Sequence, residues 1–173
     1  MKSKSFILVA AVLAIILTIG LTSASAADYP KRPISLICPW GAGGGTDAVS
    51  RIIATLLKKE LGVPVNVVNR TGGSGAVGHT AMATAKPDGY TIGMPTVEIT
   101  MMHWMGLTEV TYKDMTPIAM VNFDPAGINV LTKSSWKTYK DLENHVRENQ
   151  GKLTDSGTGQ GGIWHLAMAG WLK

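Results

Sequence analysis

Three glycine-rich segments carry the residues whose types and spacing could do chemistry. The first runs from Pro39 to Asp47, between an apolar run and a helical pattern. Glycines let the backbone approach a ligand closely, and the first turn of a helix has N–H groups without intrahelical partners. Such a segment can hold an anion. Alternatively, Thr46 or Asp47 caps the helix and the glycines form only a tight turn. No Gly-Lys-Ser/Thr follows, so the segment is not a phosphate-binding P-loop.

The second segment, Gly73-Ser74-Gly75-Ala76-Val77-Gly78, has the spacing of a dinucleotide-binding fingerprint, and Glu98 lies 20 residues beyond Gly78. Its position disfavours that interpretation, because it follows the second strand of the unit rather than the first. Glu98 falls in a loop beyond the third strand. Lys2 and Lys4 before the uncharged stretch Phe6–Leu21 also predict an export signal, and an exported protein rarely meets NAD. No cofactor is therefore expected.

The third segment spans Ser156–Gly162 and again leads from a strand pattern into a helical one. Within it, Thr158 and Gln160 could donate hydrogen bonds. Each glycine segment alone is weak evidence for binding. Their recurrence in two parts of the chain indicates two half-sites facing one cleft.

No catalytic or metal-ligating pattern accompanies these segments. The histidines form no H-x-x-x-H pair and join no Cys or carboxylate at metal-ligand spacing. The stretch around Ser74 ends in Ala where a nucleophile elbow needs Gly. An exported hydrolase using Ser74 or Ser156 with His79 or His165 remains the alternative, since spacing cannot exclude a Ser–His–acid geometry. No catalytic residue and no metal ligand are predicted.

The elements before residue 117 predict a βαβαβ unit. Amphipathic periodicity predicts a helix that buries one apolar face and ends at Gly62 and Pro64. Alternating strands and helices imply a parallel sheet, whose ligands bind beyond the carboxyl ends of the strands, here at the loops 39–47, 69–75 and 95–102. The expected strands are 34–38, 65–68 and 90–94, the second helix is 77–85, and the apolar face of the first helix is Val49, Ile52, Ile53, Leu56 and Leu57.

The elements after residue 117 predict the start of a second domain. Strands are expected at 117–121, 126–131 and 152–155. Thr138 and Asp141 form a capping-box pattern that opens a helix running to about Asn149, and a last helix is expected over 163–173. The predicted crossover lies near Asn122, which gives domains at 27–122 and 123–173. Because the second unit has no closing element, we expect the N-terminal portion of a longer protein, with an incomplete sheet in the first domain.

Residues 1–26 have the order of a secretory signal peptide. Lys2 and Lys4 precede the uncharged stretch Phe6–Leu21, and Ala24-Ser25-Ala26 fits the cleavage pattern, so cleavage is expected near Ala26 or Ala27. A membrane anchor is the alternative, but it usually needs about 20 apolar residues. Without the two lysines the net charge falls from +4 to +2 and no basic cluster remains, so no nucleic-acid partner is expected.

Four motifs follow one another in the mature chain: Tyr29-Pro30-x-Arg32-Pro33-Ile34, Pro39-Trp40-x-Ala42-Gly43-Gly44-x-x-Asp47, Val68-Asn69-Arg70 and Pro87-Asp88-Gly89-Tyr90-Thr91. Two later stretches are Thr116-Pro117-Ile118-Ala119 and Gly157-x-Gly159. Together and in this order they resemble the Bug family, the periplasmic substrate-binding proteins of tripartite tricarboxylate transporters.

The resemblance implies an α/β fold of the two-domain, type II-like periplasmic binding architecture, here truncated within domain 2. It implies closure on a small organic anion, whose carboxylate is held largely by backbone N–H groups of the loops at 39–47 and 69–75. Domain 2 adds the loop at 156–162. Thr71-Gly72-Gly73-Ser74-Gly75 and Gly161-Gly162 depart from the family's usual sequences, so the ligand cannot be transferred from a relative.

Together these observations predict a non-enzymatic, monomeric receptor that delivers a di- or tricarboxylate, or a related organic acid, to membrane transport subunits. A non-functional truncated fragment is a further alternative. Trp40 stands inside the first glycine segment, where it either stacks on a ligand or packs against the neighbouring loop. The predicted ligand-binding residues are Trp40, Gly43, Gly44, Gly45, Thr46, Asp47, Gly73, Ser74, Gly75, Thr158, Gly159 and Gln160.

Overall fold

The computed structural model describes residues 29–173, and the chain from Arg32 onward forms one compact unit. A three-stranded parallel sheet lies at its centre, with the strand order β2-β1-β3. The strands are β1 (Ile34–Cys38), β2 (Val65–Asn69) and β3 (Thr91–Gly93). The predicted α/β class and parallel sheet are confirmed. The predicted signal peptide lies outside the described residues.

Strand β1 is central because it pairs with a strand on each side. Ile34 is level with Val65, and Ser35 is level with Thr91. Both faces of a central parallel strand are covered, which favours a nearly continuous apolar run. Four of the five β1 residues are buried, and Leu36 joins Ala54 and Met94 in the main core cluster.

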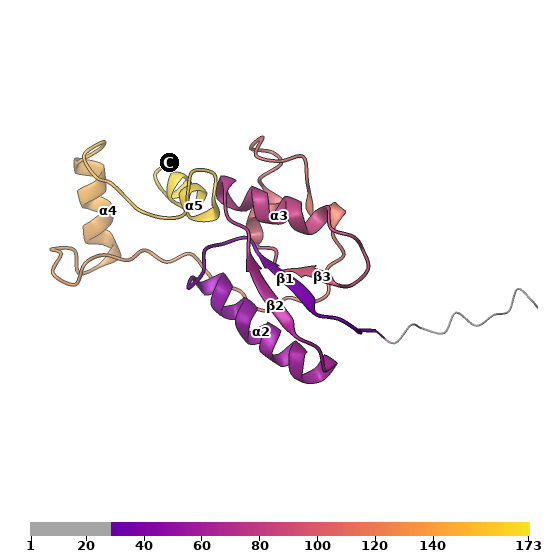
Figure 1. Cartoon of the computed structure of the whole chain (residues 1–173). Coiled ribbons are helices and arrows are strands. Elements are labelled where there is room, and N and C mark those ends of the chain that lie inside the picture. Colours follow the sequence, from indigo (N-terminus) through magenta and orange to yellow (C-terminus); the bar gives the residue numbers. More distant parts are fainter. Residues whose placement is uncertain (1–28) are drawn as a thin grey trace, which may run out of the picture. The chain divides into compact units, whose positions relative to one another are not determined.

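Two helices connect the strands and contact different parts of the sheet. Helix α2 (Gly45–Leu61) packs on β1 and β2, whereas α3 (Ala76–Ala83) packs on β1 and β3. They lie on opposite sides of the sheet in Figure 1, as right-handed crossovers require when the chain moves first to one side of β1 and then to the other. The direction changes between β1 and β3, which makes their carboxyl ends the expected ligand crevice.

Helix α2 does not bury the whole apolar face predicted for it. Ile52 is 60% exposed and Leu56 is 53% exposed. The residues turned most fully inward are instead Asp47, Ser50 and Ala54, while Val49 and Ile53 pack on the flank of the core. Small side chains on this line let the helix approach the sheet closely, so the buried stripe is rotated away from the most hydrophobic one. As predicted, α2 ends at Gly62, which adopts a left-handed conformation.

The later part of the chain contains two helices, α4 (Tyr139–Glu148) and α5 (Ile163–Trp171). The predicted capping box is confirmed, since Thr138 Oγ1 accepts a hydrogen bond from the N–H of Asp141, whose carboxylate accepts one from the N–H of Thr138. Short 3₁₀ turns lie at η1 (Gly73–Gly75), η2 (Val97–Thr100) and η3 (Tyr112–Asp114).

The strands predicted at 117–121, 126–131 and 152–155 are not formed, and these predictions are wrong for this structure. A strand needs a hydrogen-bonded neighbour, and among residues 29–173 only β1, β2 and β3 pair in a ladder. The alternating apolar side chains of the first segment consequently face solvent. Ile118 is 87% exposed and Met120 is 83% exposed.

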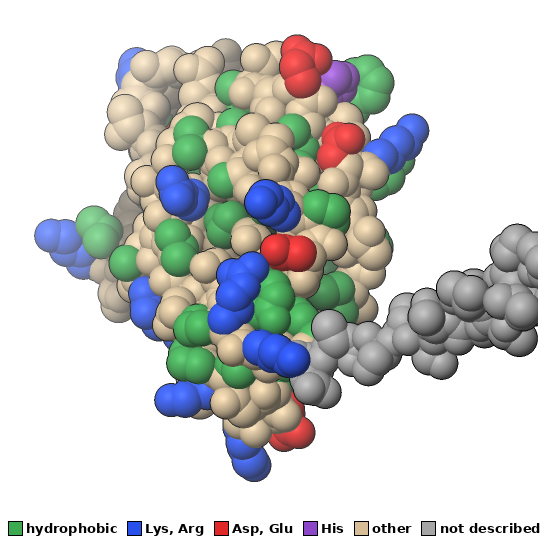
Figure 2. All heavy atoms as spheres, turned by 45° about the vertical axis from the view of Figure 1, so that its right-hand side comes forward, with side chains coloured by type: hydrophobic (Ala, Val, Ile, Leu, Met, Phe, Trp, Pro, Cys, Tyr) green, Lys and Arg blue, Asp and Glu red, His purple; other side chains and the backbone are tan. Residues whose placement is uncertain are grey.

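The surface mixes charged and apolar side chains. On the face shown in Figure 2, lysines and arginines are spread out with apolar side chains between them.

None of the helices that the structure describes combines the length and the apolar composition needed to span a bilayer.

Candidate functional site

The first glycine loop connects the carboxyl end of β1 to the start of helix α2, which has no side-chain cap. Gly44 is the N-cap of α2, and no side chain caps the first turn. Gly43 has φ +83°, a left-handed conformation that favours glycine. Gly43, Gly44 and Gly45 are all exposed. The alternative in which Thr46 or Asp47 caps this helix is therefore wrong. The N–H groups of Gly43 and Gly44 are engaged by Asp47 and by the carbonyl oxygen of Gly41, so the donors left without a cap are the amides of the first turn of this 17-residue helix, beginning at Gly45.

Asp47 lies beneath this loop and shapes it from within. Asp47 is only 2% exposed. Its Oδ2 accepts hydrogen bonds from the N–H of Gly43 at 2.9 Å and from Nε of Arg51 at 2.8 Å. Its other oxygen accepts from Nδ2 of Asn69 at 2.9 Å. The bond from Arg51 holds the pKa of the Asp47 carboxyl well below its usual range, and the bonds from Gly43 and Asn69 add to this. The carboxylate thus orders the glycine backbone rather than facing the loop surface.

Residues of the second glycine loop have positive φ angles, in the left-handed region of backbone conformation. Gly72, Gly73 and Gly75 have φ values of +128°, +55° and +93°, and Ser74, which has a side chain, also lies there at +52°. Left-handed backbone is uncommon for a non-glycine residue and concentrates at functional sites. The Ser74 hydroxyl donates a 2.6 Å hydrogen bond to the carbonyl oxygen of Gln160. This bond brings the second and third predicted loops together.

The last glycine of the dinucleotide-like pattern has a packing role. A Cβ atom on Gly78 would lie 2.5 Å from Cα of Pro39 and 2.6 Å from the carbonyl oxygen of Arg70. Only glycine allows α3 to approach the ends of β1 and β2 so closely. Glu98, at the ribose-binding spacing, is buried and hydrogen-bonded within the protein. Close helix packing therefore accounts for the end of this motif without a nucleotide.

The third glycine loop contributes one unpaired polar atom. Within the described chain, the buried hydroxyl of Thr158 has no hydrogen-bond partner. Gly159 and Gln160 are exposed, whereas Gly161 and Gly162 are buried beside the N-terminus of α5. A buried hydroxyl without a partner is costly, so Thr158 is suited to donate to a bound group.

Thr96, in the loop after β3, connects the first two glycine loops. Its hydroxyl accepts a 3.1 Å hydrogen bond from Nε1 of Trp40 and donates to Oε2 of Glu98 at 2.5 Å. Its N–H donates to Nε2 of His79 at 3.0 Å, and Nδ1 of that histidine lies 2.7 Å from the carbonyl oxygen of Gly75. Trp40 thus packs against the neighbouring loops, and its indole N–H is engaged by Thr96.

Sequence reasoning missed this connection. The loop at 95–102 was expected at the carboxyl end of the third strand, at the edge of the sheet where the other loops end, but neither Thr96 nor Glu98 was predicted to belong to the site. Which loops meet across that edge depends on the strand order, and the order β2-β1-β3 places β1 beside β3.

His79 is held as a neutral imidazole of one tautomer. Because Nε2 accepts from the Thr96 N–H, the ring proton sits on Nδ1 and is donated to Gly75. Burial lowers the pKa of His79, although its hydrogen bonds and the nearby Glu98 oppose this effect. Ser74 bonds to Gln160, and Nδ1 of His165 accepts from the N–H of Gly161 at 3.3 Å. In the part of the chain described, neither candidate serine is hydrogen-bonded to either candidate histidine.

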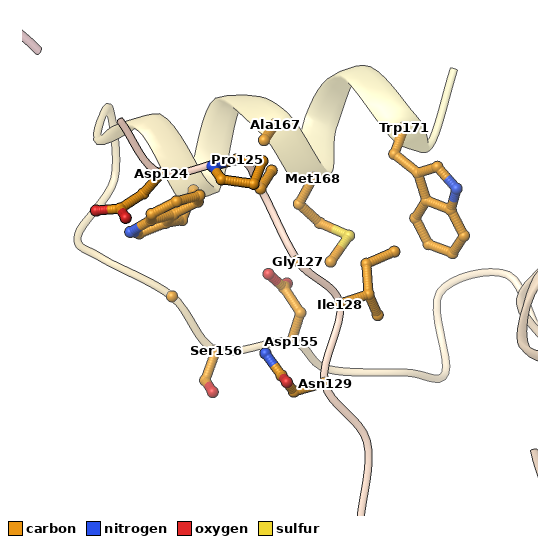
Figure 3. A pocket seen from close by; sticks show the side chains of 13 residues that line it. Asp124, Pro125, Gly127, Ile128, Asn129, Asp155, Ser156, Ala167, Met168 and Trp171 are labelled. Atoms are coloured by element: carbon orange, nitrogen blue, oxygen red, sulfur yellow. The ribbon is translucent and has the colours of Figure 1, made fainter. Parts of the chain in front are cut away.

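An apolar cavity of about 680 Å³ lies beside the start of the third glycine loop, and no residue of the first two loops lines it. It is bounded by residues 124–129, residues 155–157 and the inner side of α5, and none of the predicted site residues lines it. Figure 3 shows Met168 extending from α5 toward Gly127 and Ile128. The hollow separates two segments that were expected to be strands, so it reflects their lack of pairing. We place the candidate site at the glycine loops, where the polar groups converge.

Residues 29–173 contain no cluster of three or more His, Cys, Asp or Glu side chains arranged to hold a metal ion. Cys38 is a buried free thiol in β1. Among the hydrogen-bond donors that the loops present are backbone amides, the Thr158 hydroxyl and the side chain of Gln160.

A sequence profile of the tripartite tricarboxylate transporter family receptor matches residues 49–171. The chain belongs to this receptor family. Among its relatives, a UPF0065 protein from the tcbD-tcbE intergenic region of Pseudomonas sp. is 32% identical over 161 residues, covering 91% of this chain and 48% of the relative. BugT of Bordetella pertussis is 37% identical over 115 residues, covering 64% of this chain and 35% of BugT. The chain spans about half the length or less of these curated relatives.

Solved structures show the same fold. The crystal structure of a TctC solute-binding protein from Polaromonas is 40% identical, with a TM-score of 0.58 over 82% of this chain and 48% of that chain. The periplasmic binding protein BugD is 26% identical, with a TM-score of 0.59 over 83% of this chain and 50% of that chain. These likenesses confirm the predicted resemblance to the Bug family and the periplasmic binding fold.

Proposed function

We propose that this protein is a periplasmic receptor that captures a small carboxylate, either a di- or tricarboxylate or a related organic acid. Export through the predicted signal peptide supports the location, as do relatives described as periplasmic binding proteins. The receptor works as a monomer, uses no cofactor and delivers its ligand to the membrane subunits of a tripartite transporter. No bond is made or broken in the bound molecule.

The main observation that supports this proposal is the uncapped start of α2. Its amides lie in an exposed glycine loop at the carboxyl end of β1, beside the point where the sheet changes direction. The positive end of the helix dipole and the free N–H groups favour a carboxylate. Arg51, in the second turn of α2, is engaged by Asp47, and we therefore assign the anion to the backbone amides of the helix start.

The second and third loops supply the opposing side of the proposed site. The Ser74–Gln160 bond places the two loops in contact, and the unpaired Thr158 hydroxyl offers a donor. Ligand binding then favours a closed arrangement of the two predicted domains, because donors from both can reach the anion only when they approach. Such closure requires that the ligand bind the closed state more tightly than the open one.

Titration calorimetry of the full-length protein against a panel of mono-, di- and tricarboxylates tests this function. We expect saturable 1:1 binding of at least one carboxylate, with the ligand recovered unchanged after incubation. A neutral sugar and an organic cation of similar size serve as controls. Binding of a control but of no carboxylate would contradict the proposal, and conversion of an ester substrate would favour the hydrolase alternative.

A further inference from the structure

Glu98 is a buried acid whose two oxygens both accept hydrogen bonds. The residue is 2% exposed. Oε2 accepts from the hydroxyl of Thr96 at 2.5 Å, and Oε1 accepts from the N–H of Ile163 at 3.2 Å. The second bond spans 65 residues and joins the loop after β3 to the first residue of α5.

Helix α5 has no cap of its own. Its N-cap is Gly162, and no side-chain cap bond is made there by neighbouring residues of the helix start. A carboxylate at a helix N-terminus is stabilised by the free amides and by the helix dipole. Glu98 supplies that carboxylate from a distant part of the sequence, and these interactions offset the cost of burying the acid.

The same carboxylate is linked to the first two glycine loops. Trp40 donates to Thr96 and Thr96 donates to Glu98, so an unbroken series of hydrogen bonds runs from the first loop to α5. The Thr96 N–H extends the series through His79 to Gly75 in the second loop. Movement of α5 away from the sheet would break this series at its Glu98–Ile163 bond.

We infer that Glu98 is the positioning residue that holds the third ligand loop against the first two and thereby sets the affinity of the receptor. This inference rests on the proposed carboxylate-binding function and goes beyond it, because Glu98 contacts the protein rather than the ligand. Its carboxylate keeps the closed arrangement populated before any ligand arrives. The apparent dissociation constant equals the intrinsic one divided by the fraction of competent protein, so loss of Glu98 weakens binding without removing a ligand contact.

The test compares Glu98→Ala and Glu98→Gln with a matched control, Glu109→Ala, an exposed acid in the same segment. Hydrogen exchange at the Ile163 amide is measured without ligand, with the amides of β1 as the reference. We expect Glu98→Ala to speed exchange at Ile163 at least tenfold, about the change that one hydrogen bond to a carboxylate represents. In Glu98→Gln the exchange rate at Ile163 should lie between those of the wild-type protein and Glu98→Ala, because the amide oxygen of Gln still accepts from the Ile163 N–H but carries no charge.

Calorimetry on the same variants, with the carboxylate that the wild-type protein binds, gives the second readout. We expect Glu98→Ala to weaken binding about tenfold or more, with partial rescue in Glu98→Gln and no change in Glu109→Ala. If Glu98→Ala does not fold, Thr96→Val removes the donor to Glu98 with little change in shape and tests the same series of bonds.

The two proposals fail in different ways. Unchanged exchange at Ile163, or unchanged affinity in Glu98→Ala, would overturn the role of Glu98 while leaving carboxylate binding intact. Absence of carboxylate binding by the wild-type protein would overturn the proposed function and the affinity role together. Exchange at Ile163 would then still decide whether Glu98 holds α5.

Discussion

The hydroxyl of Ser74 donates a 2.6 Å hydrogen bond to the carbonyl oxygen of Gln160, 86 residues further along the chain. Ser74 makes this contact from a left-handed backbone conformation, with φ +52°. The conformation is unfavourable for a residue with a side chain, and the hydrogen bond helps to offset it. The contact joins the first part of the chain to the third glycine loop.

Ser74→Ala should therefore weaken ligand binding while leaving the fold intact. It removes one neutral hydrogen bond, worth about 0.5–1.5 kcal/mol, so affinity should fall about two- to tenfold. Ser74→Gly removes the same bond and relieves the backbone strain, which separates the two effects. Calorimetry measures the change, and Ser135→Ala, at an exposed serine after the predicted domain boundary, is the control. Wild-type affinity in both Ser74 variants would show that the contact plays no part in binding.

Gly78→Ala should destabilise the protein and displace α3. The new methyl group would meet backbone atoms of Pro39 and Arg70 at 2.5 and 2.6 Å, and neither can move without distorting a strand end. Overpacking of this kind costs about 1–3 kcal/mol. Thermal unfolding measures the loss. Gly170→Ala in α5 is the matched control, because its methyl group meets nothing within 4 Å and alanine favours a helix. Equal stability of the two variants would contradict the close approach of α3.

The regular elements before residue 100 could be predicted because local pattern determines them. Strand β1 is a short apolar run, and Gly62 marks the end of α2. The orientation of α2 could not be predicted in the same way. Hydrophobicity favoured a stripe containing Ile52 and Leu56, but close packing selected the stripe with the small Ser50 and Ala54.

The expected strands after residue 116 failed for a different reason. Their alternation is present in the sequence, but a strand forms only with a hydrogen-bonded neighbour, which the described chain does not provide there. The glycine loops of the candidate site could be proposed from the sequence, because runs of glycine mark segments where the backbone can approach a ligand. Thr96 and Glu98 were missed, because their roles depend on which loops meet in space.

Asp47→Asn should lower stability at neutral pH, with a smaller effect in acid. The pKa of the Asp47 carboxyl is lowered in the folded protein, chiefly by the hydrogen bond from Arg51. The ionised group therefore stabilises the fold above the unfolded-state pKa of about 3.9, and this contribution is lost as the pH falls through the folded-state pKa. Thermal midpoints at pH 7 and pH 3 test this.

The difference in thermal midpoint between the wild-type protein and Asp47→Asn should be smaller at pH 3 than at pH 7. The carboxyls of Asp141 and Glu143 also have lowered pKa values, but they titrate in both proteins and cancel in the comparison. The control is Glu60→Gln, at an exposed position in the last turn of α2. Its thermal midpoint should differ little from that of the wild-type protein at either pH. A difference for Asp47→Asn that does not depend on pH would contradict an ionic role for this carboxylate.

Gly45→Val should abolish ligand binding without unfolding the protein. A Cβ atom on Gly45 meets nothing within 4 Å, so the valine side chain would occupy open space beside the first turn of α2. That space is where the proposed site places the carboxylate against the helix amides. Gly44→Val should also block binding, but its Cβ would lie 3.3 Å from the carbonyl oxygen of Gly41, so some adjustment of the loop is expected.

The comparison of these variants locates the anion most directly. Gly45→Ala, with a smaller side chain, should weaken binding less than Gly45→Val, and thermal midpoints should stay near that of the wild-type protein. Gly170→Val, at a glycine of α5 that also faces open space, should keep the affinity unchanged because it lies outside the loops. Retained affinity in both Gly45→Val and Gly44→Val would remove the start of α2 from the site. The carboxylate would then have to be held by amides of the second and third loops.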